Sequence, residues 1–376
     1  MNMKILYASA AHDPLDINSG SGSDFQFHQA FLRAGADVHI VGPFKDNADT
    51  IEKIYRKFHS LFTNRRYAKY SEKFLTQNTH FVTMAIREIN PDFIFVRNLA
   101  PIVKLQTNIP IVYCLDTTLK GSQEQWPIFS QLEYLRMLQW ERIAVKKSNA
   151  LITYSKWSRD ILVDYYKADP EKVMVMPIPA SFPPGVSPEF EQKKPPTQEK
   201  VNLLLVGKDS YRKGIDIAQK IVQSLNSSGF RASLKIVGTE GKDSLFTNYH
   251  GYFDKSNQEQ LSEYLSFYQW AHILIHPARF EAAGIVPSEA AAFGVPTITN
   301  NAGGLATTVE DGISGIVLPS GSNVEKYCDE IINLIKNPIQ YTRLSNSTRQ
   351  RYDKELNWRI AGENMVRFIT KSLSLT

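Results

Sequence analysis

The stretch VNLLLVGKDSYRKGIDIAQKIVQSLNSSGFRASLKIVG, residues 201–238, decides the fold class of this chain. It opens with a nearly continuous apolar run, which is typical of a strand buried on both faces of a parallel sheet. A helical pattern follows in GIDIAQKIVQSL, and SLKIVG then has the pattern of a second strand. A strand, a helix and a strand in this order build a doubly wound α/β domain. The alternation continues to GIVLP at residues 315–319, so we predict one such domain over residues 201–356.

The first half of the chain has the same organisation. KILYAS, FQFHQAFLRAG and DVHIVGP read as strand, helix and strand, and DFIFV, PIVYCL and ALITYS continue the series. This predicts a first Rossmann-like domain over residues 1–185. Between the halves, SFPPGVSPEFEQKKPPTQEK is dense in proline and charge and has no hydrophobic period, so we predict a linker over residues 186–200.

Composition excludes several classes of protein. The 376 residues are 43% hydrophobic and 22% charged, which is typical of a globular chain with more than one domain. No apolar run approaches the roughly 18 residues that span a bilayer. The two cysteines, Cys114 and Cys328, lack metal-ligand spacing, so we expect a reducing cytoplasmic location without a zinc site. Zincin, nucleophile-elbow and P-loop motifs do not occur.

Residues 280–296, FEAAGIVPSEAAAFGVP, are the densest in functional signals. Pro287 suits the first turn of a helix, we place Glu289 in that turn, and Gly294 and Pro296 end the helix. The amides at the start of this helix then form an anion site that the helix dipole strengthens. We expect a diphosphate there, bound by the backbone of Gly284, Ile285 and Val286.

The two glutamates of this segment suit a different ligand. Glu281 and Glu289 lie eight positions apart, and carboxylates beside an anion site repel phosphate. They accept hydrogen bonds from sugar hydroxyls, and one carboxylate can hold both hydroxyls of a ribose diol. Two glutamates at this spacing also occur often by chance, as a first-turn acid and an exposed loop residue.

This region resembles the donor-binding signature of the family 4 retaining glycosyltransferases. The match runs from GYFDKSNQEQLSEYLSFYQWAHILIHPARFE (251–281) through Pro296 and Gly303–Gly304 to DGISGIVLP (311–319), which is most of the second half. The resemblance implies the GT-B fold, in which two Rossmann-like doubly wound domains face each other across a cleft. A C-terminal helix, here about residues 357–376, crosses back to the N-terminal domain in that fold.

The resemblance also implies an activity. Family members transfer a sugar, with retention of configuration, from a nucleotide diphosphate sugar to an acceptor. Here the implied donor is of the UDP or GDP type, and the acceptor is a glycan, a lipid-linked molecule or a small molecule. No cofactor or metal is implied, and the implied context is cell-envelope or polysaccharide biosynthesis. By the same resemblance, Glu289 holds the ribose, Glu281 lies near the transferred sugar, and Tyr252 and Phe253 lie near the nucleobase.

A second matching element is VGKDSYRKG, residues 206–214. Transfer from a diphosphate needs cations where charge develops on the leaving group. Lys213 matches the family's lysine, whereas Lys208 stands where arginine is common, and Arg212 is a candidate to share that role. Lysine lacks the bidentate fork of arginine, so the members of this cation pair stay open. The alternative is a solvated, charged turn.

In the first half, the segment NSGSGSDFQF joins the first strand to the first helix. Its Gly20 and Gly22 allow a backbone to approach a donor phosphate or an acceptor, although a flexible turn is the alternative. Asp116 follows PIVYCL and is a candidate to orient the acceptor or the donor sugar, or is an ordinary turn former. Together with Glu281 and Lys213 it forms our predicted catalytic set, in which no general base is assigned.

Residues 51–74 are locally basic, with seven lysines and arginines against two glutamates, 7 − 2 = +5, equal to the +5 of the whole chain. Apolar residues recur there at helical spacing, and lysines and arginines lie off that stripe. Three interpretations remain open: an ordinary solvated helix, a phosphate-bearing acceptor, or contact with an anionic inner-membrane face. Nucleic acid is not expected, because no nucleic-acid motif accompanies the charge.

Two further functions stay open for the whole chain. One is a sugar-nucleotide epimerase of the same two-domain architecture, and the other is a protein that binds a nucleotide sugar without turning it over.

Overall fold

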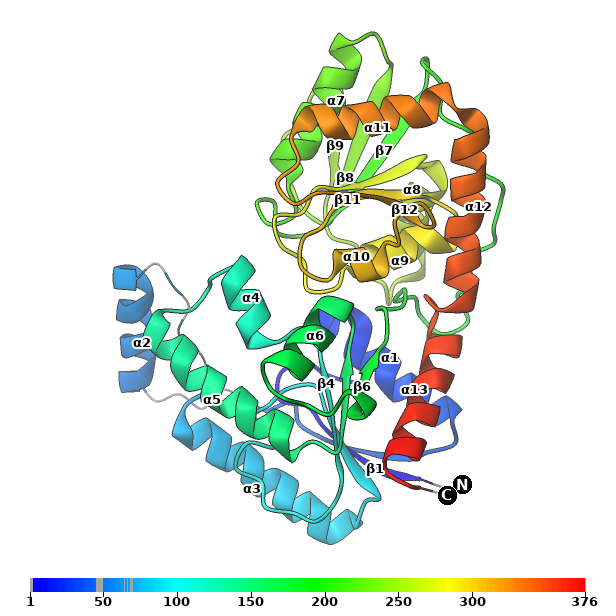
Figure 1. The fold of residues 1–376 in the computed structure, drawn as a ribbon. Helices are drawn as coiled ribbons and strands as arrows, with labels where there is room; N and C mark the ends of the chain where they lie inside the picture. Colours follow the sequence, from blue (N-terminus) through cyan, green and yellow to red (C-terminus); the bar gives the residue numbers. More distant parts are fainter. Residues whose placement is uncertain (1–2, 45–49, 64, 66, 68–69, 376) are drawn as a thin grey trace. The chain divides into compact units, whose positions relative to one another are not determined.

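The computed structural model describes residues 3–44, 50–63, 65, 67 and 70–375 (Figure 1). The chain forms two compact units, the first from Met1–Met176 with Gly362–Thr376 and the second from Pro177–Ala361. The division lies after Met176, so residues 177–200 belong to the second unit, which we had predicted to begin at residue 201. The predicted fold class, two doubly wound α/β domains, is confirmed by the two sheets described next.

The first unit contains a six-stranded sheet with the order β2-β1-β3-β4-β5-β6, and all of its paired strands are parallel. The strands are β1 Lys4–Ala8, β2 Asp37–Val41, β3 Phe93–Val96, β4 Ile111–Leu115, β5 Ala150–Thr153 and β6 Val173–Val175. The helices are α1 Ser23–Arg33, α2 Thr50–Thr63, α3 Glu72–Ile89, α4 Leu119–Gln125, α5 Gln131–Lys147 and α6 Lys156–Asp164, with 3-10 turns η1 Ser19–Gly22 and η2 Pro170–Lys172.

Helices cover both faces of this sheet, as its buried central strands require. Side chains of α3, α5 and α6 pack with the sheet in one core cluster. On α1, Phe27 and Phe31 pack against aromatic rings of β3 in tilted and edge-on arrangements. The C-terminal helix α13, Trp358–Ser372, joins this unit from Gly362, where an added Cβ would lie 2.9 Å from Ala30 Cβ. The predicted return of a C-terminal helix to the first domain is therefore confirmed.

The second unit contains a six-stranded parallel sheet with the order β12-β11-β10-β7-β8-β9. The strands are β7 Val201–Val206, β8 Ala232–Val237, β9 Thr247–His250, β10 Ile273–His276, β11 Thr297–Asn300 and β12 Gly315–Leu318. The helices are α7 Ile215–Ser227, α8 Gln258–Trp270, α9 Ile285–Ala292, α10 Leu305–Thr308, α11 Val324–Lys336 and α12 Pro338–Lys354. One core cluster lies under α7 and α11, and another lies under α8 and α9.

Strand order locates the ligand edge of each sheet. Open parallel sheets bind ligands beyond the carboxyl ends of their strands, at the point where the strand order reverses. The reversal lies between β1 and β3 in the first unit and between β7 and β10 in the second. The segment VGKDSYRKG leaves the end of β7, and Glu281 follows the end of β10. The topology therefore brings these two predicted segments to one switch point.

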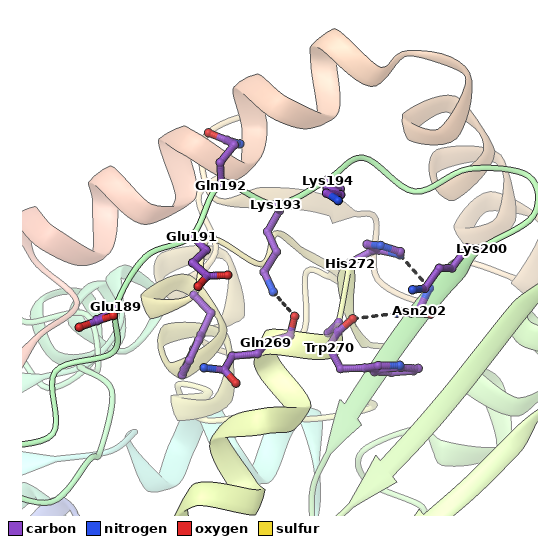
Figure 2. Close-up of a pocket in the computed structure, with 12 residues that line it drawn as sticks. Glu189, Glu191, Gln192, Lys193, Lys194, Lys200, Asn202, Gln269, Trp270 and His272 are labelled. Carbon is purple, nitrogen blue, oxygen red and sulfur yellow. Dashed lines mark hydrogen bonds between the residues drawn. The ribbon is translucent and has the colours of Figure 1, made fainter.

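The predicted linker is packed along the second unit (Figure 2). Lys193 donates hydrogen bonds to the carbonyl oxygens of Tyr268 and Gln269 at 2.8 and 2.5 Å, where its charge complements the C-terminal dipole of α8. A cavity of about 360 Å³ lies beside it, with His272 and Asn202 in its wall. Asn202 is the second residue of β7 and His272 precedes β10, so this cavity is at the amino end of the sheet, opposite the switch point.

None of the helices in the described part of the chain combines the length and the apolar character needed to cross a membrane.

Candidate functional site

The loops after β7 and β10 touch each other at the switch point of the second sheet. Gly214 ends the first loop with φ +71°, and an added Cβ there would lie 2.1 Å from the carbonyl oxygen of Pro277. Only glycine permits this approach, which fixes the start of α7 against the loop after β10. At Gly207, an added Cβ would lie 2.6 Å from Cγ of Lys213, so the lysine stem packs directly on the loop backbone.

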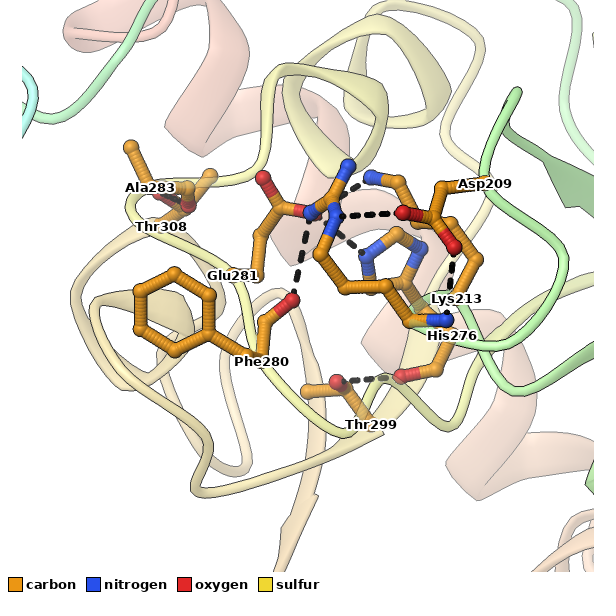
Figure 3. Close-up of polar contacts among 9 residues, drawn as sticks. Asp209, Lys213, His276, Phe280, Glu281, Ala283, Thr299 and Thr308 are labelled. Carbon is orange, nitrogen blue, oxygen red and sulfur yellow. Dashed lines mark hydrogen bonds and ion pairs between the residues drawn. The ribbon is translucent and has the colours of Figure 1, made fainter. Parts of the chain in front are cut away.

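Two of the predicted cations converge on one of the predicted glutamates (Figure 3). Nη1 of Arg212 lies 2.9 Å from Oε2 of Glu281, and Nζ of Lys213 contacts the same oxygen. The Glu281 backbone is held as well, because Gly304 N–H donates to its carbonyl oxygen at 2.9 Å. Arg212, Lys213 and Glu281 form what we call the switch-point cluster. In the sequence these residues belong to two separate motifs, and in the structure their side chains are in contact.

Lys208 has a different partner. Its Nζ lies 4.1 Å from the ring centroid of the exposed Tyr252, a cation–π contact. Phe253, which we also predicted near the nucleobase, packs inward against Phe267 at 5.5 Å between ring centroids. Of the two aromatic residues, Tyr252 is therefore the more exposed, and Lys208 lies beside it.

The electrostatics of the switch-point cluster keep Glu281 ionised. Burial by itself raises the pKa of Glu281, but Lys213 and the other basic neighbours lower it, and the net pKa is well below its ordinary value. His276, at the end of β10, has Nε2 3.8 Å from Oε2 of Glu281. Burial, and then Lys213, lower the pKa of His276 to about 4. At neutral pH Glu281 is therefore ionised, and the imidazole of His276 beside the cluster is neutral.

The pKa of His276 predicts a pH-dependent stability. Because its pKa is about 4 in the folded state and about 6.5 when unfolded, the unfolded chain binds more protons between these values. The stability contribution is complete above pH 6.5 and is lost as the pH falls toward 4. We expect His276→Gln to flatten the curve of unfolding free energy against pH in this window, measured by urea unfolding. An unchanged slope would contradict this account.

Helix α9 begins beside the cluster. Gly284 is its N-cap with φ +81°, and an added Cβ would lie 3.4 Å from Cγ of Glu281. The first-turn amides, among them those of Ile285 and Val286, have no carbonyl of their own helix to donate to. The predicted anion site thus adjoins the two cations. The helix begins at Ile285, so our placement of Glu289 in its first turn is wrong, because Glu289 is the fifth residue.

Gly284 has a conformation and a packing that both oppose a side chain. An added Cβ would lie 2.6 Å from Cδ2 of Leu305, while at Gly312, with φ +72°, nothing lies within 4 Å. Gly312→Ala therefore measures the cost of the left-handed backbone, about 1–2 kcal/mol. We expect Gly284→Ala to lower the free energy of unfolding by about 1–3 kcal/mol more than Gly312→Ala does, because overpacking a core typically costs that much. Urea unfolding of both variants tests this; equal losses would contradict it.

Glu289 is completely buried and is held by three side chains. Oε2 accepts hydrogen bonds from the hydroxyls of Tyr264 at 2.6 Å and Tyr268 at 2.8 Å, and Oε1 forms an ion pair with Nζ of Lys255 at 2.6 Å. A carboxylate offers about four acceptor positions, and these contacts fill three. A ribose diol needs two, so Glu289 can hold the ribose as we predicted only if one of these three partners moves away.

Sequence reasoning missed Lys255. Its Nζ also donates to the carbonyl oxygen of Ser181 at 3.0 Å, and it lies 4.9 Å from the ring centroid of Tyr264. The available signal was its position in GYFDKS, two residues after the second of the aromatic residues predicted near the base. His276 was not singled out either, although it ends a strand at the switch point.

A second cluster lies at the switch point of the first sheet. Arg97, which follows β3, has Nη1 3.1 Å from Oδ2 of the buried Asp24 and Nη2 in contact with Asp116. Its guanidinium also lies over the rings of Phe27 and Tyr154, at 5.0 and 5.5 Å. Asp116 is the exposed member, with 59% of its side chain accessible. Arg97 therefore orients the predicted carboxylate, while Asp24 anchors Arg97.

The remaining predicted residues of the first unit lie near the same edge of the sheet. Gly20 and Gly22 form the turn η1 directly before α1, and Gly20 packs against the ring of His12. Glu141 is buried and accepts a hydrogen bond from Leu119 N–H, at the start of α4, at 2.8 Å. Burial raises its pKa to about 7, against hydrogen bonds that lower it. These contacts give Glu141 a structural role at the start of α4.

Two family models match the chain. The one described as Glycosyltransferase Family 4 matches residues 25–180, and the one described as Glycosyl transferases group 1 matches residues 186–351. The chain belongs to glycosyltransferase family 4.

Curated relatives of this family 4 member include the D-inositol 3-phosphate glycosyltransferase of Frankia alni. It is 25% identical over 264 residues, which cover 63% of this chain and 62% of that protein. The lipopolysaccharide glucosyltransferase WaaG of Escherichia coli is 29% identical over 208 residues, covering 49% of this chain and 52% of WaaG. The matched segments thus span about half to three fifths of these two relatives.

Two solved structures share the fold of this chain. Sucrose-phosphate synthase from Thermosynechococcus elongatus superposes with a TM-score of 0.72 at 17% identity, covering all of both chains. Anabaena HepE in complex with UDP-glucose superposes with a TM-score of 0.62 at 16% identity, covering 98% of this chain and all of HepE. The family 4 chain therefore has the GT-B fold, as the sequence resemblance implied.

Among the residues that the structure describes, no three histidine, cysteine, aspartate or glutamate side chains gather as metal ligands would.

Proposed function

We propose that this family 4 protein is a retaining glycosyltransferase that takes a sugar from a nucleotide diphosphate sugar of the UDP or GDP type. The observation that carries the proposal is the switch-point cluster beside the N-terminus of α9. Arg212 and Lys213 there share Oε2 of Glu281, and the first-turn amides of the helix begin next to that glutamate. Two cations and a helix N-terminus suit a diphosphate, and one ionised carboxylate suits a sugar hydroxyl.

The chemistry follows from the charges. As the bond between the sugar and the diphosphate breaks, negative charge develops on the leaving group, and preorganised cations and amides stabilise it without a metal ion. Arg212 and Lys213 are held in place by Glu281 before the donor arrives, which reduces the reorganisation needed during the reaction. Since both cations contact Oε2, we assign Oε1 of Glu281 to a hydroxyl of the transferred sugar.

The first unit is proposed to supply the acceptor side. Asp116 is exposed and is oriented by Arg97, so it is suited to accept a hydrogen bond from an acceptor hydroxyl. We propose a glycan, a lipid-linked molecule or a small molecule as acceptor, in cell-envelope or polysaccharide biosynthesis. The names of the relatives, which include a lipopolysaccharide glucosyltransferase and glycogen synthases, support this range. A cytoplasmic location agrees with the two buried, unpaired cysteines.

The first experiment identifies the donor. Thermal unfolding is followed with a panel of nucleoside diphosphates and nucleotide sugars, because a ligand of the folded state raises the melting temperature by mass action. Release of nucleoside diphosphate from the selected donor is then measured with and without acceptors. Acceptor-dependent release supports the proposal. Interconversion of donors would indicate the epimerase, and binding without any release would indicate a protein that only binds nucleotide sugars.

A further inference from the structure

Helix α2 of the first unit exposes its large apolar side chains, and Figure 1 shows the helix at the margin of that unit. Leu61 and Phe62 are 70% and 84% accessible, and three further residues are more than half accessible. These are Ile54, Tyr55 and Phe58. A surface helix of a globular protein normally turns its apolar side chains toward the core. This helix does the opposite, and the sequence pattern alone did not reveal that direction.

Another face of α2 carries polar side chains. Nε2 of His59 lies 3.1 Å from Oγ of Ser130, directly before α5, and Arg56 and Glu52 pair with each other within the helix at 2.6 Å. The rings of Tyr55 and His59 also contact the ring of Tyr67, each at 5.4 Å between centroids. The Arg56 and Glu52 side chains are only 14% and 17% accessible. At 100° per residue, positions 54, 58, 61 and 62 share one face, and positions 52, 56 and 59 share the opposite face. The helix is therefore attached by its polar face, and its apolar face is outward.

Positive charge borders the outward face. Lys53 and Lys57 are exposed and lie one helical turn apart along one edge of the apolar stripe. Such a combination, with aromatic and aliphatic side chains on one face and lysines beside it, is typical of helices that lie in the headgroup region of a bilayer. The lysines complement anionic headgroups, while the apolar side chains enter the boundary of the acyl chains.

We propose that the outward face of α2, formed by Ile54, Phe58, Leu61 and Phe62 with Lys53 and Lys57 beside it, docks on a bilayer surface that carries anionic lipids. The proposal does not depend on the transferase activity. If both hold, docking places the first unit at the surface where a lipid-linked acceptor resides. A second copy of the chain would also cover apolar residues, and the experiment separates this occupant from a lipid surface.

The test is flotation of the full chain with vesicles of phosphatidylcholine alone and of phosphatidylcholine mixed with phosphatidylglycerol. We expect binding to the anionic vesicles at least about tenfold stronger than to the neutral ones, and weakening as the salt concentration rises. Leu61→Ser with Phe62→Ser, and separately Lys53→Ala with Lys57→Ala, should each lower this binding by about tenfold. The matched control is Leu245→Ser with Ile339→Ser, which changes residues of the second unit that are 88% and 87% accessible.

Several outcomes overturn the proposal. Equal flotation with neutral and anionic vesicles would show that the lysines do not contribute to docking. Equal flotation of the wild type and the Leu61/Phe62 variant would show that α2 is not the docking surface. A concentration-dependent dimer in light scattering that this variant abolishes would assign the face to a second copy. Since the changed residues are exposed, the melting temperatures should match that of the wild type, and this measurement guards against a folding defect.

Discussion

Replacing Lys213 by methionine is expected to lower kcat/KM for the nucleotide diphosphate sugar by about 10²- to 10³-fold. This is the loss typical of removing one preorganised group that stabilises transition-state charge. Methionine keeps an unbranched stem to pack on Gly207, and Glu281 keeps its ion pair with Arg212 at 2.9 Å. The variant therefore removes a positive charge from the switch-point cluster and leaves the rest of the cluster in place.

Binding measurements show where the loss arises. By calorimetry, Lys213→Met should weaken binding of the nucleoside diphosphate far more than binding of the nucleoside, since only the former carries the charge that the lysine meets. Lys220→Met is the matched control, because Lys220 is exposed on α7. Equal weakening for nucleoside and nucleoside diphosphate would refute the assignment of Lys213 to the diphosphate. If Lys213→Met weakens binding of the nucleoside diphosphate as expected but the wild type shows no turnover, the transferase activity is rejected. The assignment of Lys213 to the diphosphate would still stand.

Glu289→Gln is expected to have the complementary effect. It should weaken nucleoside binding by about 10- to 100-fold, because hydrogen bonds to a charged group contribute roughly 1.5–3 kcal/mol each. The contribution of the diphosphate to the binding free energy should be unchanged. It is obtained as the binding free energy of the nucleoside diphosphate minus that of the nucleoside. Calorimetry with both ligands measures the two quantities. If nucleoside affinity stays the same, Glu289 does not hold the ribose.

Stability must be separated from binding in this case. Glu289→Gln leaves the ammonium of Lys255 without its anion, and breaking a buried ion pair from one side costs about 3–5 kcal/mol. In the double variant Glu289→Gln with Lys255→Met, both charges are removed. Most of the unfolding free energy that Glu289→Gln alone loses should therefore be recovered, while the affinity for the nucleoside stays low. Lys255→Met alone shows whether the lysine competes with the diol. Recovery of affinity in the double variant would contradict the ribose role.

Much of the candidate site was predictable because it lies in loops that follow buried strands. The apolar runs before VGKDSYRKG and before PARFE predict parallel strands, and the carboxyl ends of such strands are where ligands bind. The helix after Gly284 was also predictable from Gly294 and Pro296 at its end. What the spacing did not predict is that Arg212, Lys213 and Glu281 share one oxygen, because this depends on the approach of Gly214 to Pro277.

Burial decided contacts that composition and spacing do not show. The segment dense in proline and charge suggested a linker, and in the structure Lys193 caps α8 and the segment packs on the second unit. Composition reports the polarity of side chains and not the carbonyl groups that they can reach in a folded chain. Similarly, Glu289 looked like an open first-turn acid, and the structure places it in the second turn, under Lys255 and two tyrosines.

The sequence by itself determined the fold class, the family and the two loops that carry the donor-site candidates, because these depend on hydrophobic periodicity and short motifs along the chain. The tertiary structure decided which candidates meet and which side chains already have partners. In the structure Lys213 forms an ion pair with Glu281, Asp116 forms one with Arg97, and the apolar face of α2 is exposed. Such contacts join residues far apart in the chain, and their geometry is set by packing between elements, which no local pattern encodes.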